Sequence, residues 1–172
     1  MGAGALLVID MINDFLLPGA PLEVPSGREI IPAVARRIEA ARGEGTPVIY
    51  LCDNHDEDDP EFAKWPPHAV KGTPGALVVD ALAPAQGDRV IAKKYYSAFF
   101  RTDLERVLED LAVEKLTVTG VLTDICVLFT CADAFMRGYG LTVPQDCVAA
   151  LSQEDHRFAL KQIQRLMEAE IV

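Results

Sequence analysis

Short apolar runs alternate along this chain with longer segments of helical periodicity, and this alternation limits the possible folds more than any other feature. The first run, residues 5–9, is continuously apolar, as is typical of a strand buried on both faces of a parallel sheet. Further strand-like runs cover residues 48–52, 89–92, 116–118, 141–143 and 171–172. The alternation predicts an α/β fold of three layers, in which a mostly parallel central sheet of about six strands carries helices on both faces.

The segments between these runs predict the helices. Apolar residues at helical spacing indicate helices over residues 28–42, 76–82, 102–111, 127–136 and 152–167. Thr102 and Glu105 have the spacing of a capping box at the start of the third of these helices. Residues 11–27 hold three prolines and two glycines, so we expect a long loop there, and a loop of this length inside a compact domain is more often functional than idle.

Size and composition narrow the class of protein. The chain has 172 residues, half of them hydrophobic, and shows no internal repeat or linker, so we expect a single domain over residues 1–172. The net charge of −10 argues against nucleic acid or an anionic membrane surface as a partner. No apolar run is long enough to span a bilayer.

The cysteines indicate a reducing compartment. Cys52, Cys126, Cys131 and Cys147 show no metal-type C-x-x-C spacing and lie mostly in apolar surroundings, which favours reduced thiols. The chain enters its first strand without a basic leader or a small-residue cleavage site, so we expect no secretory signal and a cytoplasmic protein. Cys131 and Cys147 are expected to fill the core.

Three of the predicted strands lead to residues with chemical potential, namely Asp10, Lys93 and Cys126. Cys126 lies near the start of a predicted helix, where free N–H groups favour a thiolate and can hold the negative oxygen formed when a thiolate attacks a carbonyl. Taken alone, Cys126 is more often a small buried hydrophobe, and Asp10 is more often a turn residue. Asp124 is expected to cap this helix, and His156 to be solvated.

A parallel sheet favours a functional role for Asp10, Lys93 and Cys126, because the carboxyl ends of its strands meet at one edge. There the Lys93 ammonium is expected to lower the pKa of the Cys126 thiol. Asp10 can accept the thiol proton and later deliver it to a leaving amine. The three side chains therefore suit nucleophilic attack on an amide.

A second group follows the strand over residues 48–52. Asp53 and His55 are alternate residues of an extended segment and share one face, and His68 follows in the next loop. One carboxylate and two imidazoles with open positions suit one divalent metal ion, such as zinc, iron or manganese. An Asp-x-His pattern is common by chance, but two of the three histidines of the chain lie here, within fourteen residues.

Taken together, these motifs resemble the isochorismatase-like cysteine hydrolases, and within them the nicotinamidase/pyrazinamidase branch. The resemblance extends over nearly the whole chain and implies the three-layer, Rossmann-like fold of that family. It rests on five segments in the order of the family: Val8-Ile9-Asp10 with Asn13-Asp14-Phe15, Asp53-x-His55, residues 65–76 (WPPHAVKGTPGA), Lys93-x-x-Tyr96-Ser97-Ala98-Phe99, and Gly120 to Val127 (GVLTDICV).

The resemblance implies roles for these residues. Cys126, Lys93 and Asp10 would form the catalytic triad. A cis peptide bond would precede the cysteine at Val121–Leu122, and the N–H groups of Leu122 and Cys126 would form the oxyanion hole. The metal held by Asp53, His55 and His68 would bind the pyridine nitrogen of the substrate. Aromatic residues would surround the ring: Phe15 and Trp65 on its two faces, Tyr96 and Phe100 along the pocket.

The sequence departs from the family pattern at three positions that bear on the metal rather than on the triad. A common glutamine is replaced by Ile12, a histidine that some members use as a further ligand is replaced by Glu61, and a frequent cysteine is replaced by Ala69. Whether Glu61 contributes to the metal site stays open at this point.

The resulting hypothesis is a metal-dependent nicotinamidase that converts nicotinamide, and by extension pyrazinamide, to the acid and ammonia through a cysteine thioester, serving NAD salvage. The alternative is a related cysteine amidohydrolase that acts on another small amide, carbamoyl or ureido compound. A member without catalytic activity that only binds a partner is a third possibility, against which the complete triad and metal ligands argue. Family members are often oligomeric, so a homo-oligomer is also expected.

Overall fold

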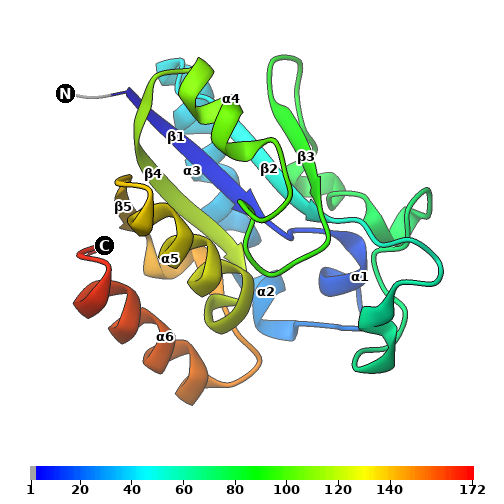
Figure 1. The fold of residues 1–172 in the computed structure, drawn as a ribbon. Helices are drawn as coiled ribbons and strands as arrows, with labels where there is room; N and C mark the ends of the chain where they lie inside the picture. The colour runs from blue at the N-terminus through cyan, green and yellow to red at the C-terminus, as the bar shows by residue number, and fades with distance from the viewer. Residues whose placement is uncertain (1–2) are drawn as a thin grey trace.

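A seven-stranded sheet forms the centre of the protein in the computed structural model, which describes residues 3–172 (Figure 1). The strands follow the order β3-β2-β1-β4-β5-β7, with the short β6 paired to β4, and all these pairings are parallel. Their bounds are β1 Ala3–Ile9, β2 Val48–Asp53, β3 Arg89–Lys93, β4 Val113–Val121, β5 Gly140–Val143, β6 Val148–Ala149 and β7 Glu170–Ile171. The predicted α/β class and parallel sheet are confirmed.

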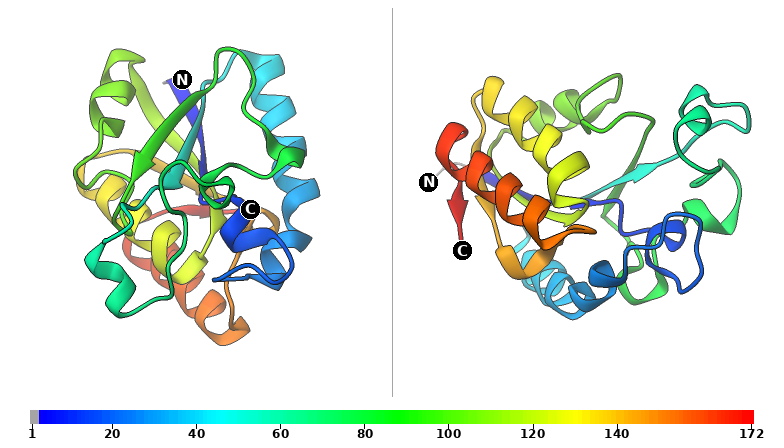
Figure 2. Two further views of the ribbon diagram at one scale, coloured as in Figure 1. Left: turned by 90° about the vertical axis from the view of Figure 1, so that its right-hand side faces the viewer. Right: turned by 90° about the horizontal axis from the view of Figure 1, so that it is seen from below.

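Helices cover both faces of this sheet, and Figure 2 shows α3 on one face with α5 and α6 on the other. The α-helices are α1 Asn13–Leu16, α2 Pro25–Glu29, α3 Ile31–Glu44, α4 Leu104–Asp110, α5 Leu128–Met136 and α6 Gln153–Leu166. A π-helical turn, Thr123–Val127, leads directly into α5. Since π-helical turns are often found at functional sites, this one marks the stretch that carries Cys126.

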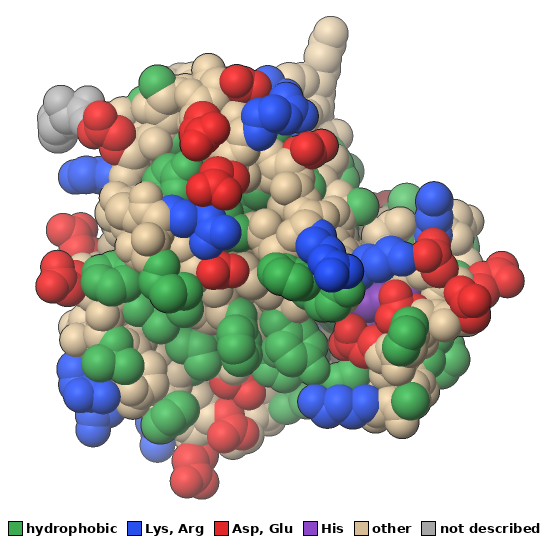
Figure 3. Space-filling view, in the orientation of Figure 1, with side chains coloured by type: hydrophobic (Ala, Val, Ile, Leu, Met, Phe, Trp, Pro, Cys, Tyr) green, Lys and Arg blue, Asp and Glu red, His purple; other side chains and the backbone are tan. Residues whose placement is uncertain are grey.

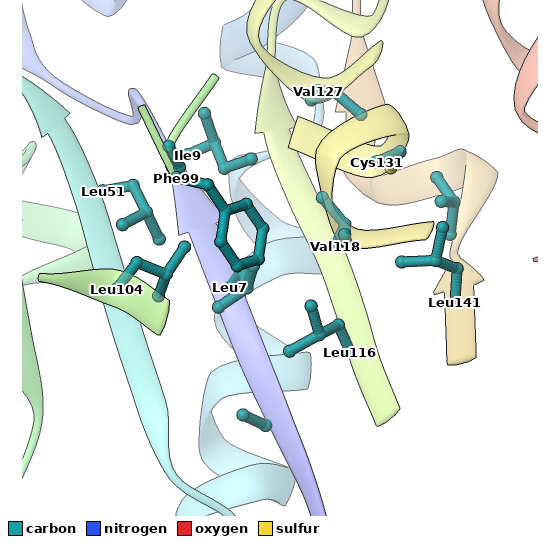
Figure 4. Close-up of a cluster of buried hydrophobic side chains, with 14 of the residues drawn as sticks. Leu7, Ile9, Leu51, Phe99, Leu104, Leu116, Val118, Val127, Cys131 and Leu141 are labelled. Carbon is teal, nitrogen blue, oxygen red and sulfur yellow. The ribbon is translucent and has the colours of Figure 1, made fainter. Parts of the chain in front are cut away.

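The sheet divides the apolar core into two layers, one on each face. On β1, Leu7 and Ile9 pack towards α4, α5 and α6, whereas Leu6 and Val8 pack towards α3. Figure 4 shows the first layer, where Leu7 and Ile9 lie among Leu104, Phe99 and other labelled side chains. Because alternate residues of a strand point to opposite faces, a strand covered on both sides must be apolar throughout, as the run at residues 5–9 is.

Several predicted elements differ in detail from the observed ones. The loop expected over residues 11–27 contains α1 and α2, and the helix expected from residue 28 begins at Ile31, where Pro32 in the first turn is tolerated. The helix expected over residues 76–82 is instead two short 3₁₀ turns. The strand β6 has only two residues, too few for a period to be recognised.

The predicted capping box at α4 is not formed, because the N-cap is Asp103 and no side chain caps the helix. Thr102 Oγ1 accepts a hydrogen bond from the N–H of Leu104 at 3.2 Å, just before the helix. Glu105 does not return to the helix start, because its carboxylate pairs with Arg137 at 3.2 Å. At α6 a side-chain cap is present, because Ser152 Oγ accepts hydrogen bonds from the N–H groups of Glu154 and Asp155.

Gly120 allows β1 and β4 to approach closely just before the functional stretch. Its φ is +112°, a conformation that residues with a side chain rarely adopt, and a Cβ atom here would lie 2.0 Å from the carbonyl oxygen of Ile9. Only glycine fits this position without moving one of the two strands. The backbone that leads to Cys126 is therefore fixed against β1 and, through it, against Asp10.

Apolar side chains also gather on the outside of α5 and α6, where they form a belt across the face shown in Figure 3. Exposed members of these helices are Phe129, Phe135, Met136 and Phe158. The expected homo-oligomer stays a prediction. No helix among residues 3–172 is long and apolar enough to cross a membrane.

Candidate active site

The carboxyl ends of four neighbouring strands bring the candidate residues to one edge of the sheet. Asp10 directly follows β1, Asp53 and Lys93 end β2 and β3, and Cys126 lies in the π-helical turn that follows β4. Asp53 and Lys93 are also partners in the strand register. Since β3, β2, β1 and β4 are consecutive in the sheet, side chains from distant parts of the sequence meet here.

Lys93 is the centre of this group. Its ammonium nitrogen Nζ lies 2.8 Å from Asp10 Oδ2, 2.5 Å from Asp53 Oδ1 and 3.5 Å from the sulfur of Cys126. Asp10 also accepts a hydrogen bond from the backbone N–H of Asp53 at 2.8 Å through its other oxygen. Carboxylate oxygens of Asp10 and Asp53 lie within 4.8 Å of Cys126 Sγ. The structure thus brings the predicted triad together.

Burial and neighbouring charges have opposite effects on the pKa values of Lys93 and Asp53. Lys93 is 2% exposed, and burial alone would lower the pKa of its ammonium group. Asp10 and Asp53 outweigh burial and hold the pKa of Lys93 well above its usual value. Burial likewise acts to raise the pKa of Asp53, but Lys93 and His55 outweigh it and hold that pKa below its usual value. Lys93 and Asp53 are therefore a charged pair.

At Asp10 and Cys126, by contrast, burial outweighs the charge of Lys93, and both pKa values rise. Burial, helped by the neighbouring Asp53 charge, raises the pKa of Asp10 to about 6, with Lys93 opposing the rise. Burial also raises the pKa of the Cys126 thiol well above its usual value, and the Lys93 ammonium offsets only part of this. The Lys93 ammonium acts to lower the thiol pKa as expected, but burial outweighs it, so the net pKa of the resting thiol is raised. Cys126 rests as a thiol and needs a base at the moment of attack.

The backbone before Cys126 has the expected geometry. The peptide bond between Val121 and Leu122 is cis. The N–H of Val127 donates to the carbonyl of Leu122 at 3.1 Å, which closes the π-helical turn around the cysteine. Leu122 and Cys126 both line the same cavity. Their assignment as oxyanion hole stays a prediction.

Asp53, His55 and His68 also come together. Each offers a ligand atom within 4.8 Å of the others, and all three side chains are buried. Nδ1 of His68 lies 2.8 Å from the carbonyl oxygen of Pro66, which fixes this nitrogen as the N–H donor and leaves Nε2 as a ligand. Nδ1 of His55 lies 3.1 Å from Asp59 Oδ2, and neither ring nitrogen of this buried side chain has a hydrogen-bond partner.

This arrangement fits a divalent cation. An unpartnered imidazole nitrogen in the protein interior is costly, and a metal ion would satisfy it together with an oxygen of Asp53. Carboxylates behind metal-bound imidazoles commonly orient the ring, which is the position of Asp59. Glu61 lies beside the group and lines the same cavity. Burial and the charge of Asp53 raise the pKa of Glu61.

The loop that carries His68 is fixed from two sides. Asp14 of α1 accepts the N–H of Ala69 at 2.8 Å, so the helix holds the loop end. The segment of His55 pairs with the same loop, because the His55 N–H donates to the carbonyl of Ala69 and its own carbonyl accepts from Lys71. The rings of His55 and His68 are consequently only 4.8 Å apart between centroids.

A cavity of about 390 Å³ joins the two groups. Its lining includes Cys126 of the triad together with Asp53 and His68 of the metal group. A hollow on the face in Figure 3 shows a histidine beside acidic side chains. The remaining lining residues are Phe15, Pro21, Leu22, Glu23, Val24, Glu61, Trp65, Tyr96, Leu122, Asp124, Ile125, Leu151 and Asp155. The cavity thus presents the thiol and the metal ligands to one small molecule.

Three of the four predicted pocket residues line this cavity. Phe15 lies 5.6 Å from the ring of His68, and the indole N–H of Trp65 donates to the Tyr96 hydroxyl at 3.4 Å. Phe100 is a correction, because its side chain is 46% exposed and packs edge-on against Tyr95, outside the cavity. The chain turns away after Ser97, so the register of a strand does not continue to residue 100.

Sequence reasoning also misjudged or missed three residues, Asp124, His156 and Asp155. Asp124 does not cap the helix, and its Oδ1 is buried without a hydrogen-bond partner. His156 is not simply solvated, because its Nδ1 lies 2.9 Å from Thr123 Oγ1. Asp155 lies in the first turn of α6 and reaches the cavity only through the packing of α6 on the π-helical turn. No local pattern in the sequence announces such a contact.

Comparison with known proteins agrees with this geometry. The sequence matches the isochorismatase domain model over residues 4–172. The chain belongs to the isochorismatase family, and the predicted family is confirmed.

Two solved structures share the fold along nearly their whole length. The pyrazinamidase/nicotinamidase of Streptococcus mutans is 38% identical with a TM-score of 0.94, over 99% of this chain and 100% of that one. The pyrazinamidase of Pyrococcus horikoshii, solved in complex with zinc, is 33% identical with a TM-score of 0.92, over 98% of each chain.

Relatives in sequence have more varied names. A probable inactive nicotinamidase of Arabidopsis thaliana is 39% identical over 88% of this chain and 83% of that protein. The maleamate amidohydrolase of Pseudomonas putida is 32% identical over 88% and 75%, and an N-carbamoylsarcosine amidase of Arthrobacter is 33% identical over 84% and 58%. The predicted enzyme class, a hydrolase of amides, is confirmed at the level of the family, and these names leave the substrate open.

The central position of Lys93 leads to a prediction about stability. Replacing Lys93 by Met leaves two buried carboxylates without their cation, so we expect the free energy of unfolding to fall by about 3 kcal/mol or more. The neighbouring Lys94 is a matched control, because it is exposed and pairs with Asp56 at the surface. Lys94→Met should change stability by less than about 1 kcal/mol. Urea unfolding of both variants measures the difference, and equal losses would contradict the role of Lys93.

Proposed function

We propose that this protein is a metal-dependent nicotinamidase, which hydrolyses nicotinamide to nicotinate and ammonia. The observation that carries the proposal is the shared cavity, which presents the sulfur of Cys126 and the ligand group of Asp53 and His68 to the same space. A flat ring with a nitrogen on one side and a carboxamide on the other matches two such partners. Phe15, Trp65 and Tyr96 supply aromatic surface for the ring.

The first half of the reaction forms a thioester. Asp10 accepts the proton of the Cys126 thiol as the sulfur attacks the carboxamide carbon, and a tetrahedral intermediate results. The N–H groups of Leu122 and Cys126 hold its negative oxygen. Asp10 then returns the proton to the amide nitrogen, the carbon–nitrogen bond breaks, and ammonia leaves. The raised pKa of Asp10, at about 6, suits a group that both takes and gives a proton near neutral pH.

The second half regenerates the enzyme. Asp10 accepts a proton from a water molecule, whose oxygen attacks the thioester carbon. The carbon–sulfur bond breaks, the proton passes to the leaving sulfur, and nicotinate is released. Lys93 keeps its charge throughout, since two carboxylates surround it, and it holds Asp10 and Cys126 in reach of each other.

Asp53, His55 and His68 would hold one divalent metal ion, for which zinc, iron and manganese are candidates, with Glu61 as a further oxygen ligand. When bound, the ion supplies a Lewis acid for the ring nitrogen and so orients the substrate. The zinc complex of the Pyrococcus horikoshii pyrazinamidase supports this assignment. Pyrazinamide offers the same ring nitrogen and carboxamide and would be accepted, and the product would serve NAD salvage in the cytoplasm.

An amidase for another small amide is the second candidate, and the maleamate and N-carbamoylsarcosine enzymes among the relatives favour it. Those two compounds have no ring nitrogen for a metal ion to hold. The buried imidazole nitrogen of His55 therefore argues for the ring amide. One relative, from Arabidopsis thaliana, is named a probable inactive nicotinamidase. In this protein Lys93 contacts both Asp10 and Cys126, which argues for an active enzyme.

The direct test is ammonia release from nicotinamide by the metal-loaded protein. Cys126→Ala removes the nucleophile, so we expect the rate to fall more than about a thousandfold. Cys131→Ala is the matched control, because Cys131 is a buried cysteine of α5 away from the cavity. A wild-type protein that leaves nicotinamide intact, or a Cys126→Ala variant that remains active, would contradict the proposal.

Activity should also depend on pH through Asp10. The carboxylate must be ionised to accept the thiol proton, so kcat/KM should fall below an apparent pKa of about 6, by about tenfold for each further pH unit. Rates between pH 5 and pH 8 measure this limb, with the bound metal quantified at each pH to separate loss of the ion. A flat profile down to pH 5 would exclude Asp10 as the base.

Metal content tests the ligand assignment without reference to activity. The His55→Ala/His68→Ala double variant should lose the stoichiometric metal that the wild type retains after desalting. His156→Ala is the control, because His156 bonds to Thr123 and does not line the cavity. Elemental analysis of the three proteins gives the answer, and equal metal content in all of them would contradict the assignment.

A further inference from the structure

The charged side chains that line the cavity are all acidic in the part of the chain that the structure describes. They are Glu23, Asp53, Glu61, Asp124 and Asp155, and neither a lysine nor an arginine joins them on the described walls. A small molecule that enters the cavity therefore meets negative charge from several directions. Three of these carboxylates have an evident partner or role, and two do not.

The first three are accounted for by their neighbours. Asp53 pairs with Lys93 and belongs to the metal group, and Glu61 lies beside that group. Glu23 is neutralised by Arg28, whose Nη1 lies 2.7 Å from its carboxylate. These acids contribute little net charge to the cavity once the ion is bound.

Asp124 and Asp155 are different, because neither forms an ion pair with any described residue. Asp124 lies two residues before Cys126 in the π-helical turn, and Asp155 reaches the cavity from the first turn of α6. Burial raises the pKa of Asp124, and the charge of Asp155 adds to the rise, which indicates that the two carboxylates act on one another. They form an acidic wall next to the nucleophile.

Two basic side chains close to the cavity, His156 and Lys64, form no ion pair with this wall. His156 contacts Thr123 through Nδ1, and burial lowers the pKa of its ring, which favours the neutral form. Lys64 lies over the ring of Trp65 and donates to the Tyr96 hydroxyl at 3.2 Å, on the side of the cavity formed by those aromatic residues. The negative charge of Asp124 and Asp155 thus remains directed at the bound molecule.

We propose that Asp124 and Asp155 select substrates by charge, so that the enzyme accepts uncharged amides and rejects amides that also carry a carboxylate. Like charges placed together oppose binding of the wrong partner, and this is how charged residues commonly contribute specificity. The proposal rests on the proposed function, since it concerns the same cavity and the same nucleophile. Maleamate and N-carbamoylsarcosine each carry a carboxylate and fall in the rejected class, whereas nicotinamide and pyrazinamide are uncharged.

The same wall would favour release of the product. Hydrolysis converts an uncharged amide into a carboxylate, so the product acquires the charge that the wall opposes. Nicotinate should therefore leave readily and inhibit weakly.

The test compares two ring amides, nicotinamide and 5-carbamoylnicotinate, of which the second carries an additional carboxylate on the ring. For the metal-loaded wild type, kcat/KM should favour nicotinamide. In Asp124→Asn/Asp155→Asn the ratio should shift towards the anionic amide by about tenfold, equivalent to about 1.4 kcal/mol. Glu154→Gln is the matched control, because Glu154 is an exposed acid of the same helical turn that does not line the cavity, and it should leave the ratio unchanged.

Asp155→Asn alone repeats the test on an exposed position if the double variant does not fold, and it should shift the ratio in the same direction. Rising salt should also reduce the preference of the wild type, because an exposed carboxylate is screened. A wild type that hydrolyses both amides equally well, or a ratio that neither variant changes, would overturn the charge selection and leave the nicotinamidase assignment intact.

If the wild type hydrolyses neither amide, the nicotinamidase assignment fails. Binding measurements then test whether Asp124 and Asp155 select ligands by charge. Calorimetric titration of the metal-loaded protein with nicotinamide and nicotinate should show weaker binding of nicotinate, with the difference reduced in the double variant. Equal binding of both compounds by the wild type, or no binding of either, would overturn the charge selection as well.

Discussion

The contact of one buried ammonium group with two carboxylates and a thiol organises the functional edge of this protein. Lys93 lies 2.8 Å from Asp10, 2.5 Å from Asp53 and 3.5 Å from Cys126, with almost no access to water. A buried lysine is stable only with such partners, and each carboxylate in turn depends on the lysine. Because Asp10 belongs to the proposed catalytic triad and Asp53 to the proposed metal ligands, the same ion pairs tie the nucleophile to the metal site.

The charges of this group would also favour a cation beside it. Asp10 and Asp53 together carry one negative charge more than Lys93 neutralises, and the structure responds by raising the pKa of Asp10 while Asp53 stays ionised. A divalent ion on Asp53, His55 and His68 would offset this excess and satisfy the unpartnered nitrogen of His55. Asp124 and Asp155 line the same cavity, so attraction for a ring nitrogen and repulsion of a carboxylate would act on one substrate.

The features that could be predicted from the sequence are those set by strand ends and by local patterns of residues. The runs that end at Asp10, Lys93 and Cys126 were enough to place these residues at one sheet edge, because parallel strands share the direction of their carboxyl ends. The resting pKa of Cys126 was not predictable, since it depends on how completely the site is buried. Phe100, Asp124 and Asp155 were misjudged or missed because their positions depend on a turn after Ser97 and on the packing of α6, which no local period encodes.

The most direct measurement of the central claim is a crystal structure of the metal-loaded Cys126→Ala protein with nicotinamide bound. The account predicts that the ring nitrogen faces an ion held by Asp53, His55 and His68, while the carboxamide carbon lies over residue 126 and Lys93 still bridges Asp10 and Asp53. An ion bound elsewhere, a carboxamide directed away from residue 126, or Lys93 paired with only one of the two carboxylates would contradict it.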